Sequence, residues 1–226
     1  MASCKIQKEP SNRKRILVVD DHAVLREGLV AQINRESDLV VCGEAEDARQ
    51  ALASIEKLSP DLVLADITLP GRNGLELIRD IRALRPGLPV LVLTMHDASV
   101  FAERVLRAGG NGYISKQQTG RRLIEAIRRV LSGQIYLSDD VSTRLLGSLS
   151  GQRPTSTPSP VELLTDRELE VFTLIGQAKE TKVIAQRLGV SAKTVEAHRA
   201  SIKRKLKLKT GPELTRHAVL WIEAVR

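Results

Sequence analysis

The chain has 226 residues, with 35 Lys and Arg against 27 Asp and Glu, which gives a formal net charge of +8. This length allows two modest hydrophobic cores, and no apolar run approaches the roughly 18 residues that a membrane span needs. Residues 1–15 are polar and basic, which argues against a secretory signal and favours the bacterial cytoplasm. Residues 147–226 carry a net charge of +6 and residues 16–146 a net charge of −2, so the second half is the better candidate for binding nucleic-acid phosphates.

Four short apolar segments in the first half each end at a polar, chemically active side chain. Segments 16–19, 62–65, 90–93 and 112–115 are followed by the pair Asp20-Asp21, by Asp66, by Thr94 and by Lys116. Apolar runs rich in Val and Leu, separated by amphipathic stretches, are typical of buried parallel strands alternating with helices. The C-terminal ends of such strands line one crevice, where ligands bind. The pattern therefore predicts three carboxylates, a hydroxyl and an amine at one edge of an α/β sheet.

These side chains have the chemistry of a phosphoryl site. Three carboxylates in one crevice repel one another unless a cation lies among them, and oxygen ligands near a phosphate suit Mg²⁺. Beside such an ion one aspartate can act as a nucleophile toward a phosphoryl group, while lysine and a hydroxyl meet its oxygens. Any one of these residues alone is more simply explained as a turn residue at a strand end. Five of them at successive strand ends favour the phosphoryl site.

The first half resembles the receiver domain of two-component response regulators over residues 14–132. The resemblance rests on Asp20-Asp21-His22, on residues 66–74, on Thr94 and on residues 112–116. It implies a doubly wound, flavodoxin-like sheet of five parallel strands. It also implies that a partner sensor histidine kinase passes its phosphoryl group to this domain.

The resemblance assigns a role to each residue at the strand ends. Asp66 would accept the phosphoryl group. Mg²⁺ would be held by Asp20, Asp21, Asp66 and the carbonyl of Thr68. Thr94 and Lys116 would contact the phosphate, and Tyr113 would be the switch aromatic. Many receivers have proline after the lysine, where this chain has Gln117.

A linker separates the two halves. Residues 147–160 are rich in Ser, Gly and Pro and lack apolar periodicity, which is typical of a flexible connection. Just before it, residues 138–149 form a short helical pattern. We therefore place the connecting helix and linker at residues 133–160 and a second domain at residues 161–226.

Helical spacing and helix-start signals dominate the second domain. Thr165 with Glu168, and Thr210 with Glu213, have the spacing of a capping box. Ser191 is a good N-cap for a helix over 192–207, and the glycine-containing turn 188–191 suits a helix-turn-helix. This helix and the residues just after it, 193–209, carry seven Lys or Arg and one Glu. A charged run is more often only a solvated surface, but a basic helix with small outward residues can also enter the DNA major groove.

The second domain resembles the LuxR-type helix-turn-helix that ends the NarL/FixJ class of response regulators. Residues 164–168, 184–191 and 203–206 carry the resemblance, which implies a small all-α, four-helix domain that binds double-stranded promoter DNA. Two departures precede the turn: Ala178 replaces the usual glycine, and Thr181, which can still cap a helix, replaces the usual asparagine. The expected DNA contacts are Lys182, Ser191, Lys193, Thr194, Glu196, Ala197, His198, Arg199, Lys203, Arg204 and Lys205.

The sequence therefore predicts a transcription regulator that is switched by phosphorylation and is not an enzyme. Phosphorylation of Asp66 would move Thr94, turn Tyr113 inward, and either release the recognition helix or pair two chains into a homodimer on DNA. RNA polymerase is a further possible partner. One rival hypothesis is a constitutive DNA binder with a vestigial receiver, against which the intact crevice residues argue. Another is a phosphatase of the haloacid dehalogenase type, but Thr68 stands where that class has its second aspartate.

Overall fold

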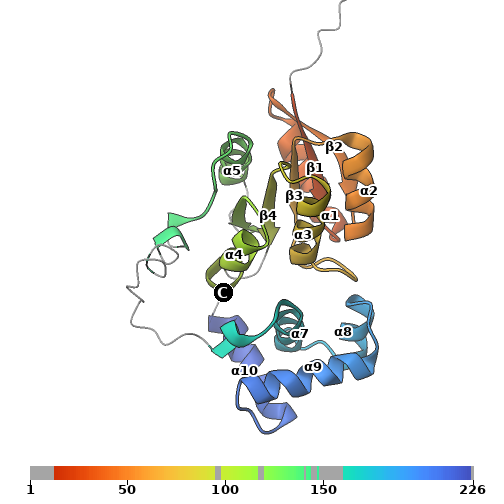
Figure 1. Cartoon of the computed structure of the whole chain (residues 1–226), viewed down its shortest axis with the longest axis vertical. Helices are drawn as coiled ribbons and strands as arrows, with labels where there is room; N and C mark the ends of the chain where they lie inside the picture. The colour runs from red at the N-terminus through yellow and green to blue at the C-terminus, as the bar shows by residue number, and fades with distance from the viewer. Residues whose placement is uncertain are drawn as a thin grey trace, which may run out of the picture.

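The computed structural model describes residues 13–94, 98–116, 120–139, 141–143, 147 and 160–224. Its N-terminal half is built on a parallel sheet of five strands in the order β2-β1-β3-β4-β5 (Figure 1). The strands are β1 (Lys14–Val19), β2 (Leu39–Ala45), β3 (Leu62–Ala65), β4 (Val90–Thr94) and β5 (Gly112–Ser115). This order confirms the predicted doubly wound, flavodoxin-like sheet.

Helices cover both faces of the sheet. They are α1 (Ala23–Asn34), α2 (Ala48–Leu58), α3 (Gly74–Leu84), α4 (Ala98–Arg107) and α5 (Arg121–Leu131). Successive residues of a strand point to opposite faces. In β1, Ile16 and Val18 accordingly pack in one cluster with residues of α1 and α5, whereas Leu17 and Val19 pack in another with residues of α2, α3 and α4. Both faces are buried, which explains why the strands read as continuous apolar runs.

The crevice lies where β1 and β3 run side by side, because the chain leaves these two strands in opposite directions across the sheet. The backbone N–H of Asp66 donates to the Val19 carbonyl at 2.9 Å, and the N–H of Asp20 donates to Ala45 at 3.0 Å. The strand ladder thus continues one residue beyond the strands. It brings the two acidic side chains to the same edge.

The C-terminal half is a module of helices, as the sequence predicted. Its elements are the short 3-10 helix η2 (Pro160–Leu163), α7 (Asp166–Gly176), α8 (Thr181–Arg187), α9 (Ala192–Lys205) and α10 (Gly211–Ala224). Phe172 of α7 is fully buried, with its ring 5.5 Å from that of Trp221 on α10. The turn between α8 and α9 contains Gly189 at φ +63°. This left-handed backbone conformation is one that glycine adopts without strain.

Local sequence signals explain most helix starts in this module, but two predictions are wrong: the cap of α8 and the end of α9. Thr165 and Glu168 form the predicted capping box, and the hydroxyl of Ser191 accepts from the backbone of Thr194. Thr181 is not a cap: Glu180 occupies that position. The helix predicted over 192–207 ends at Lys205, because Lys207 takes a left-handed φ of +56°.

The backbone conformation at Ala178 favours glycine, the residue that the resemblance leads one to expect at this position. Its φ is +59°, a left-handed conformation that costs a residue with a side chain of the order of 1 kcal/mol more than glycine. The chain therefore has a left-handed residue before the helix-turn-helix and tolerates the strain of an alanine there.

Much of the predicted connection lies outside the described residues. Asp139 and residues 141–143 are helical, within the predicted pattern over 138–149. Residues 148–159 of the linker and residues 1–12 of the chain's start are not described. Among the described residues, no helix has both the length and the apolar character needed to cross a membrane.

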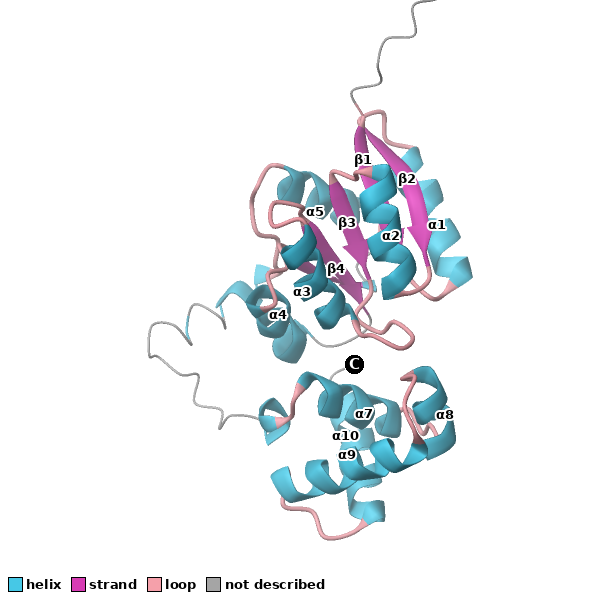
Figure 2. Cartoon of the chain, turned by 45° about the vertical axis from the view of Figure 1, so that its right-hand side comes forward, coloured by secondary structure: helices cyan, strands magenta, loops and turns pink. Residues whose placement is uncertain are grey.

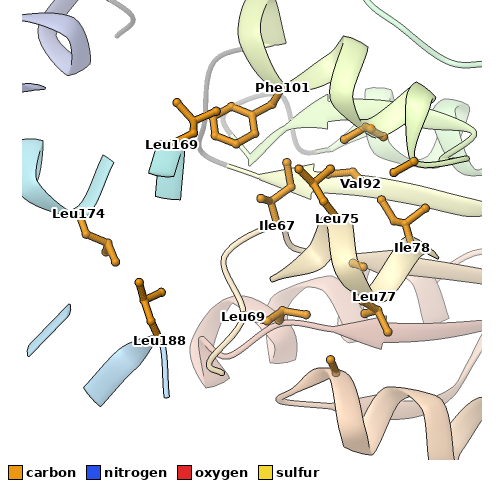
Figure 3. Packing of buried hydrophobic residues seen from close by; sticks show 14 of the residues in the cluster. Ile67, Leu69, Leu75, Leu77, Ile78, Val92, Phe101, Leu169, Leu174 and Leu188 are labelled. Atoms are coloured by element: carbon orange, nitrogen blue, oxygen red, sulfur yellow. The ribbon is translucent and has the colours of Figure 1, made fainter. Parts of the chain in front are cut away.

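The two halves pack against each other in the structure. The C-terminal ends of the strands face the four-helix module, and α7 and α8 are its nearest helices (Figure 2). One apolar cluster continues from Ile67, Leu69 and Phe101 of the first half to Leu169 and Leu188 of the second (Figure 3). The crevice at the strand ends is therefore close to the module's docked surface.

Candidate functional site

The crevice contains a buried lysine between two buried aspartates. Asp20 and Asp66 are only 2% and 4% exposed, and Lys116 is 9% exposed. The Lys116 Nζ lies 2.6 Å from Asp20 Oδ2 and 2.8 Å from Asp66 Oδ2. These residues follow β1, β3 and β5, so the structure brings together side chains that lie up to 96 positions apart in the chain, as the sequence predicted.

The aspartates decide the protonation state of the lysine. Burial, the largest single influence, acts to lower the pKa of Lys116, because a charged ammonium loses its hydration. Asp66 and Asp20 together outweigh burial through charge and hydrogen bonding, so the pKa of Lys116 is raised above its ordinary value. Lys116 thus stays an ammonium at neutral pH and can meet an anion.

The crevice has the donor set of a hard divalent cation. Ligand atoms of Asp20, Asp21, His22 and Asp66 all lie within 4.8 Å of one another. Asp66 Oδ1 is buried, and no hydrogen-bond donor in the described part of the chain reaches it. Three carboxylates balanced by one buried ammonium leave excess negative charge. This set fits Mg²⁺, which binds carboxylate oxygens beside phosphates.

His22 is the one member of this group that the sequence did not place there. It is the N-cap residue of α1, and its Nδ1 lies 2.8 Å from Asp21 Oδ1 and 3.2 Å from Asp20 Oδ1. Its side chain is 57% exposed. Only its position directly after the acid pair could have signalled the contact.

The remaining receiver residues lie close to their expected places. Thr94, at the end of β4, is fully buried, and Thr68 is half-buried in the loop after Asp66. Tyr113 of β5 is 3% exposed. The sequence predicts an inward Tyr113 for the phosphorylated protein, and the side chain is buried in this structure. Gln117 is outside the described residues.

Gly74, the last residue of the segment 66–74 that resembles the receiver family, shapes the loop after Asp66. A Cβ atom on Gly74 would lie 2.4 Å from the Asp66 carbonyl oxygen and 2.7 Å from the Ile67 Cα. The N–H of Gly74 donates to the Ile67 carbonyl at 2.7 Å, and the side chain of Asn73 caps α3 at Glu76. Glycine is required here because α3 begins directly against the loop that follows Asp66.

The candidate DNA-binding residues of α9 fall into two groups. The predicted DNA contacts that are exposed are Lys182, Ser191, Lys193, Glu196, Ala197 and Arg204, and those that are half-buried are Thr194, His198, Arg199, Lys203 and Lys205. The Glu196 carboxylate is oriented by the Thr181 hydroxyl at 2.9 Å. Burial is the main cause of the lowered pKa of His198, so this imidazole stays neutral at neutral pH.

Lys205 has an internal partner that its sequence position did not predict. Its Nζ lies 2.6 Å from Glu168 Oε2, which also accepts from the Thr165 backbone, and the Ser201 hydroxyl donates to Glu168 Oε1 at 2.7 Å. Burial acts to raise the pKa of Glu168, but these donors outweigh it and lower the pKa to about 2. The ion pair of Lys205 with Glu168 therefore connects the end of α9 to the start of α7.

Ion pairs join the two halves around the apolar contact. Asp166, at the start of α7, accepts from Arg79 at 2.6 Å and from Arg104 at 2.8 Å. Arg187, at the end of α8, reaches Asp21 in the crevice at 3.2 Å. These contacts use α7 and α8, and they leave the outward residues of α9 exposed.

Both halves match known families. Residues 16–128 match the family described as the response regulator receiver domain, and residues 162–218 match the luxR family of bacterial regulatory proteins. The oxygen regulatory protein NreC of Staphylococcus carnosus (strain TM300) is 37% identical over 209 residues, which cover 91% of this chain and 96% of NreC. The similarity therefore extends over both halves in the same order.

Two solved structures have the same arrangement of elements. RcsB from Salmonella enterica serovar Typhimurium, bound to a promoter in the presence of the phosphomimetic BeF3-, has a TM-score of 0.66 at 24% identity and covers 92% of this chain and 98% of that chain. A structure of two RcsB dimers bound to two parallel DNAs has a TM-score of 0.56 at 26% identity and covers 91% and 97% of the two chains.

Proposed function

Because the chain belongs to the response regulators that join a receiver domain to a LuxR-type DNA-binding domain, we propose that a sensor histidine kinase phosphorylates Asp66 and so controls binding to promoter DNA. The observation that carries this proposal is the environment of Asp66. It directly follows the central strand β3, one carboxylate oxygen contacts Lys116, and the other is buried without a donor among the described residues. That second oxygen supports the role of nucleophile.

Asp20, Asp21, Asp66 and the carbonyl of Thr68 would hold Mg²⁺. When bound, the ion offsets the charge of the carboxylates and of the incoming phosphoryl group. The clustering of the three carboxylates supports this assignment.

Three residues of the chain take part in the proposed phosphoryl transfer: Asp66, Lys116 and Thr94. Asp66 Oδ1 attacks the phosphorus of the phosphohistidine, a P–O bond forms as the P–N bond breaks, and the imidazole of the kinase leaves and takes a proton. The ammonium of Lys116 meets a phosphoryl oxygen, and the hydroxyl of Thr94 donates to another. Lys116 is already charged and positioned for this role, because Asp20 and Asp66 hold it.

The output step we propose is pairing of two chains on DNA rather than uncovering of a blocked helix. Lys193, Glu196 and Ala197 are exposed even with the two domains docked, so the receiver does not need to move to expose them. A twofold dimer matches two half-sites about one helical turn apart. The structure of RcsB dimers on DNA, similar to this chain at 26% identity, supports the same arrangement.

The proposal also includes the domain boundaries, the cellular location and the partners of the protein. We assign the receiver to residues 14–132, the connection to 133–160 and the DNA-binding domain to 161–226. The protein would act in the cytoplasm, without enzymatic turnover of a substrate, and would meet RNA polymerase at its promoters.

The central test is labelling of the pure protein with acetyl phosphate and Mg²⁺, followed by mass spectrometry. We expect one acid-labile phosphoryl group on Asp66, no label on the Asp66→Asn variant, and no label when Mg²⁺ is chelated. Asp61→Asn is the matched control, since Asp61 stands just before the opposite end of the same strand and pairs with Lys14. Equal labelling of the Asp66→Asn variant would refute the assignment.

A further inference from the structure

We propose that Arg187 of the DNA-binding domain acts as an internal cation of the receiver crevice, so that the docked domain and a divalent cation compete for Asp21. The inference rests on the proposed function, because it takes Asp21 as a metal ligand. Its consequence is that a divalent cation alone, without any phosphodonor, loosens the contact between the two domains.

The contact itself is direct and is fixed from both sides. The Arg187 Nη2 lies 3.2 Å from Asp21 Oδ2, and the two side chains are 26% and 22% exposed. The carbonyl of Arg187 accepts from the N–H of Gly71, in the loop after Asp66, at 3.0 Å. The same arginine therefore reaches the crevice with its side chain and is tied to the phosphoacceptor loop by its backbone.

The charges in the crevice explain why Arg187 is placed there. Lys116 engages Asp20 and Asp66, but its ammonium makes no ion pair with Asp21 among those the described residues form. Asp21 instead faces His22 with Oδ1 and Arg187 with Oδ2. Since His22 is more than half exposed, the guanidinium is the partly buried positive charge that balances this third carboxylate.

A divalent cation needs the same carboxylate and repels the same guanidinium. If the cation binds among Asp20, Asp21 and Asp66, Arg187 loses its partner and lies beside a like charge. The competition is reciprocal: the factor by which the cation weakens docking equals the factor by which docking weakens cation binding. Arg187 thus links the metal state of the receiver to the position of the DNA-binding domain.

The test compares the Mg²⁺ affinity of the full chain with that of two variants, by calorimetric titration. Arg187→Gln removes the competing charge, and Arg216→Gln is the matched control, because Arg216 is an exposed arginine on α10 of the same domain. We expect Arg187→Gln to bind Mg²⁺ about tenfold more tightly, or ~1.4 kcal/mol, and Arg216→Gln to stay within about twofold of the parent. Equal affinities in the parent and in Arg187→Gln would overturn the inference.

A second measurement follows the domains directly. In X-ray scattering, saturating Mg²⁺ should increase the radius of gyration of the parent protein, while the Arg187→Gln variant should already be expanded without Mg²⁺ and change little. A parent whose radius of gyration does not respond to Mg²⁺ would contradict the competition, whatever the titration gives.

The outcomes also separate this inference from the proposed function. If Asp21→Asn leaves Mg²⁺ affinity unchanged, or if no variant binds Mg²⁺, the crevice is not the metal site and both proposals fail. If Asp21→Asn weakens Mg²⁺ binding while Arg187→Gln does not strengthen it, the metal site stands and only the role of Arg187 is wrong.

Discussion

Two buried carboxylate–lysine sites in this chain differ in how completely the carboxylate is satisfied. In the crevice, Lys116 faces both Asp20 and Asp66, and one oxygen of Asp66 has no donor in the described structure. In the DNA-binding domain, Glu168 receives donors on both oxygens, from Ser201, Lys205 and the Thr165 backbone. The first, open site has surplus negative charge and an unpaired carboxylate oxygen, whereas both oxygens of the second, closed site are satisfied.

The difference teaches how to separate a functional site from a structural one. Burial and a lysine partner occur in both, so neither feature indicates function by itself. A closed site lowers the pKa of its acid and stabilises the fold, as at Glu168. An open site keeps repulsion and an unpaired oxygen, which a metal ion or phosphoryl group then satisfies.

The largest effect should come from removing the cation of the open site. Lys116→Met leaves two buried carboxylates without their ammonium, so we expect the free energy of unfolding in chelator to fall by about 3–5 kcal/mol. Millimolar Mg²⁺ should restore part of this loss, because the ion replaces the missing charge. Urea unfolding with and without Mg²⁺ measures both. The control Lys193→Met, at an exposed position, should change neither; a Lys116→Met protein as stable as the parent in chelator would contradict the comparison.

Glu168→Gln should lower the free energy of unfolding by slightly less than Lys116→Met, and the size of this loss should depend on pH. The pKa of Glu168 is about 2 in the folded protein against an ordinary 4.5, so at pH 7 its ionised form contributes roughly 3 kcal/mol. Because the folded pKa is lowered, this contribution is complete above pH 4.5 and is lost as pH falls toward 2. The free-energy difference between parent and Glu168→Gln should therefore shrink to less than half by pH 3.

Chemical denaturation at the two pH values measures that difference. Glu162→Gln is the control, since Glu162 is an exposed carboxylate just before the same helix. A difference that does not change between pH 7 and pH 3 would show that the charge of Glu168 is not what stabilises the fold.

Removing an acid from the open site should have a much smaller effect on stability. Asp66→Asn relieves repulsion between carboxylates while Lys116 keeps its contact with Asp20, so we expect the free energy of unfolding to change by less than about 1 kcal/mol. The same variant should lose all phosphoryl labelling. A destabilisation as large as that of Glu168→Gln would erase the distinction between the two sites.

The sequence predicted the open site well because strand ends carry a strong pattern. Asp20, Asp66, Thr94 and Lys116 each follow an apolar run, and a parallel sheet forces such ends together. The caps Thr165 and Ser191 were predictable for a similar reason, since they depend on neighbours three residues away.

The closed site and the domain contact were not predictable. Glu168 and Lys205 lie 37 positions apart, and Asp21 and Arg187 lie 166 positions apart. Single charged residues at such separations leave no periodic signal, and their pairing depends on how whole helices and domains are oriented. The same reason explains why the sequence assigned Lys205 to DNA, whereas the structure gives its ammonium an internal partner.

The smallest predicted effect concerns two neighbouring lysines of α9. Lys203 has no carboxylate partner in the described structure. Lys203→Ala should therefore weaken binding to all DNA sequences alike, and it should reduce the slope of log affinity against log salt by about one. Lys205→Ala should instead destabilise the domain, because it opens the Glu168 site. Binding isotherms at several salt concentrations separate the two; equal slopes for Lys203→Ala and the parent would exclude a phosphate contact at Lys203.

Glu196→Lys tests which residues read bases. Glu196 is exposed on the outward face of α9, and a carboxylate there can accept from cytosine N4. The substitution should change which sequences are preferred in a binding selection, whereas Lys203→Ala should not. An unchanged preference in the Glu196→Lys protein would mean that another face of α9 enters the groove.

The apolar cluster that crosses from Ile67 and Phe101 to Leu169 and Leu188 has a consequence for heat denaturation. Domains that share buried surface lose it together, so their melting becomes coupled and the calorimetric trace merges toward a single peak. A ligand that binds the receiver and leaves this contact intact would then raise the melting temperature of the DNA-binding helices as well, whereas Mg²⁺, which competes with Arg187 for Asp21, would not. Separation of the calorimetric trace into two peaks would show, without any label, the conditions under which the two domains lose their contact.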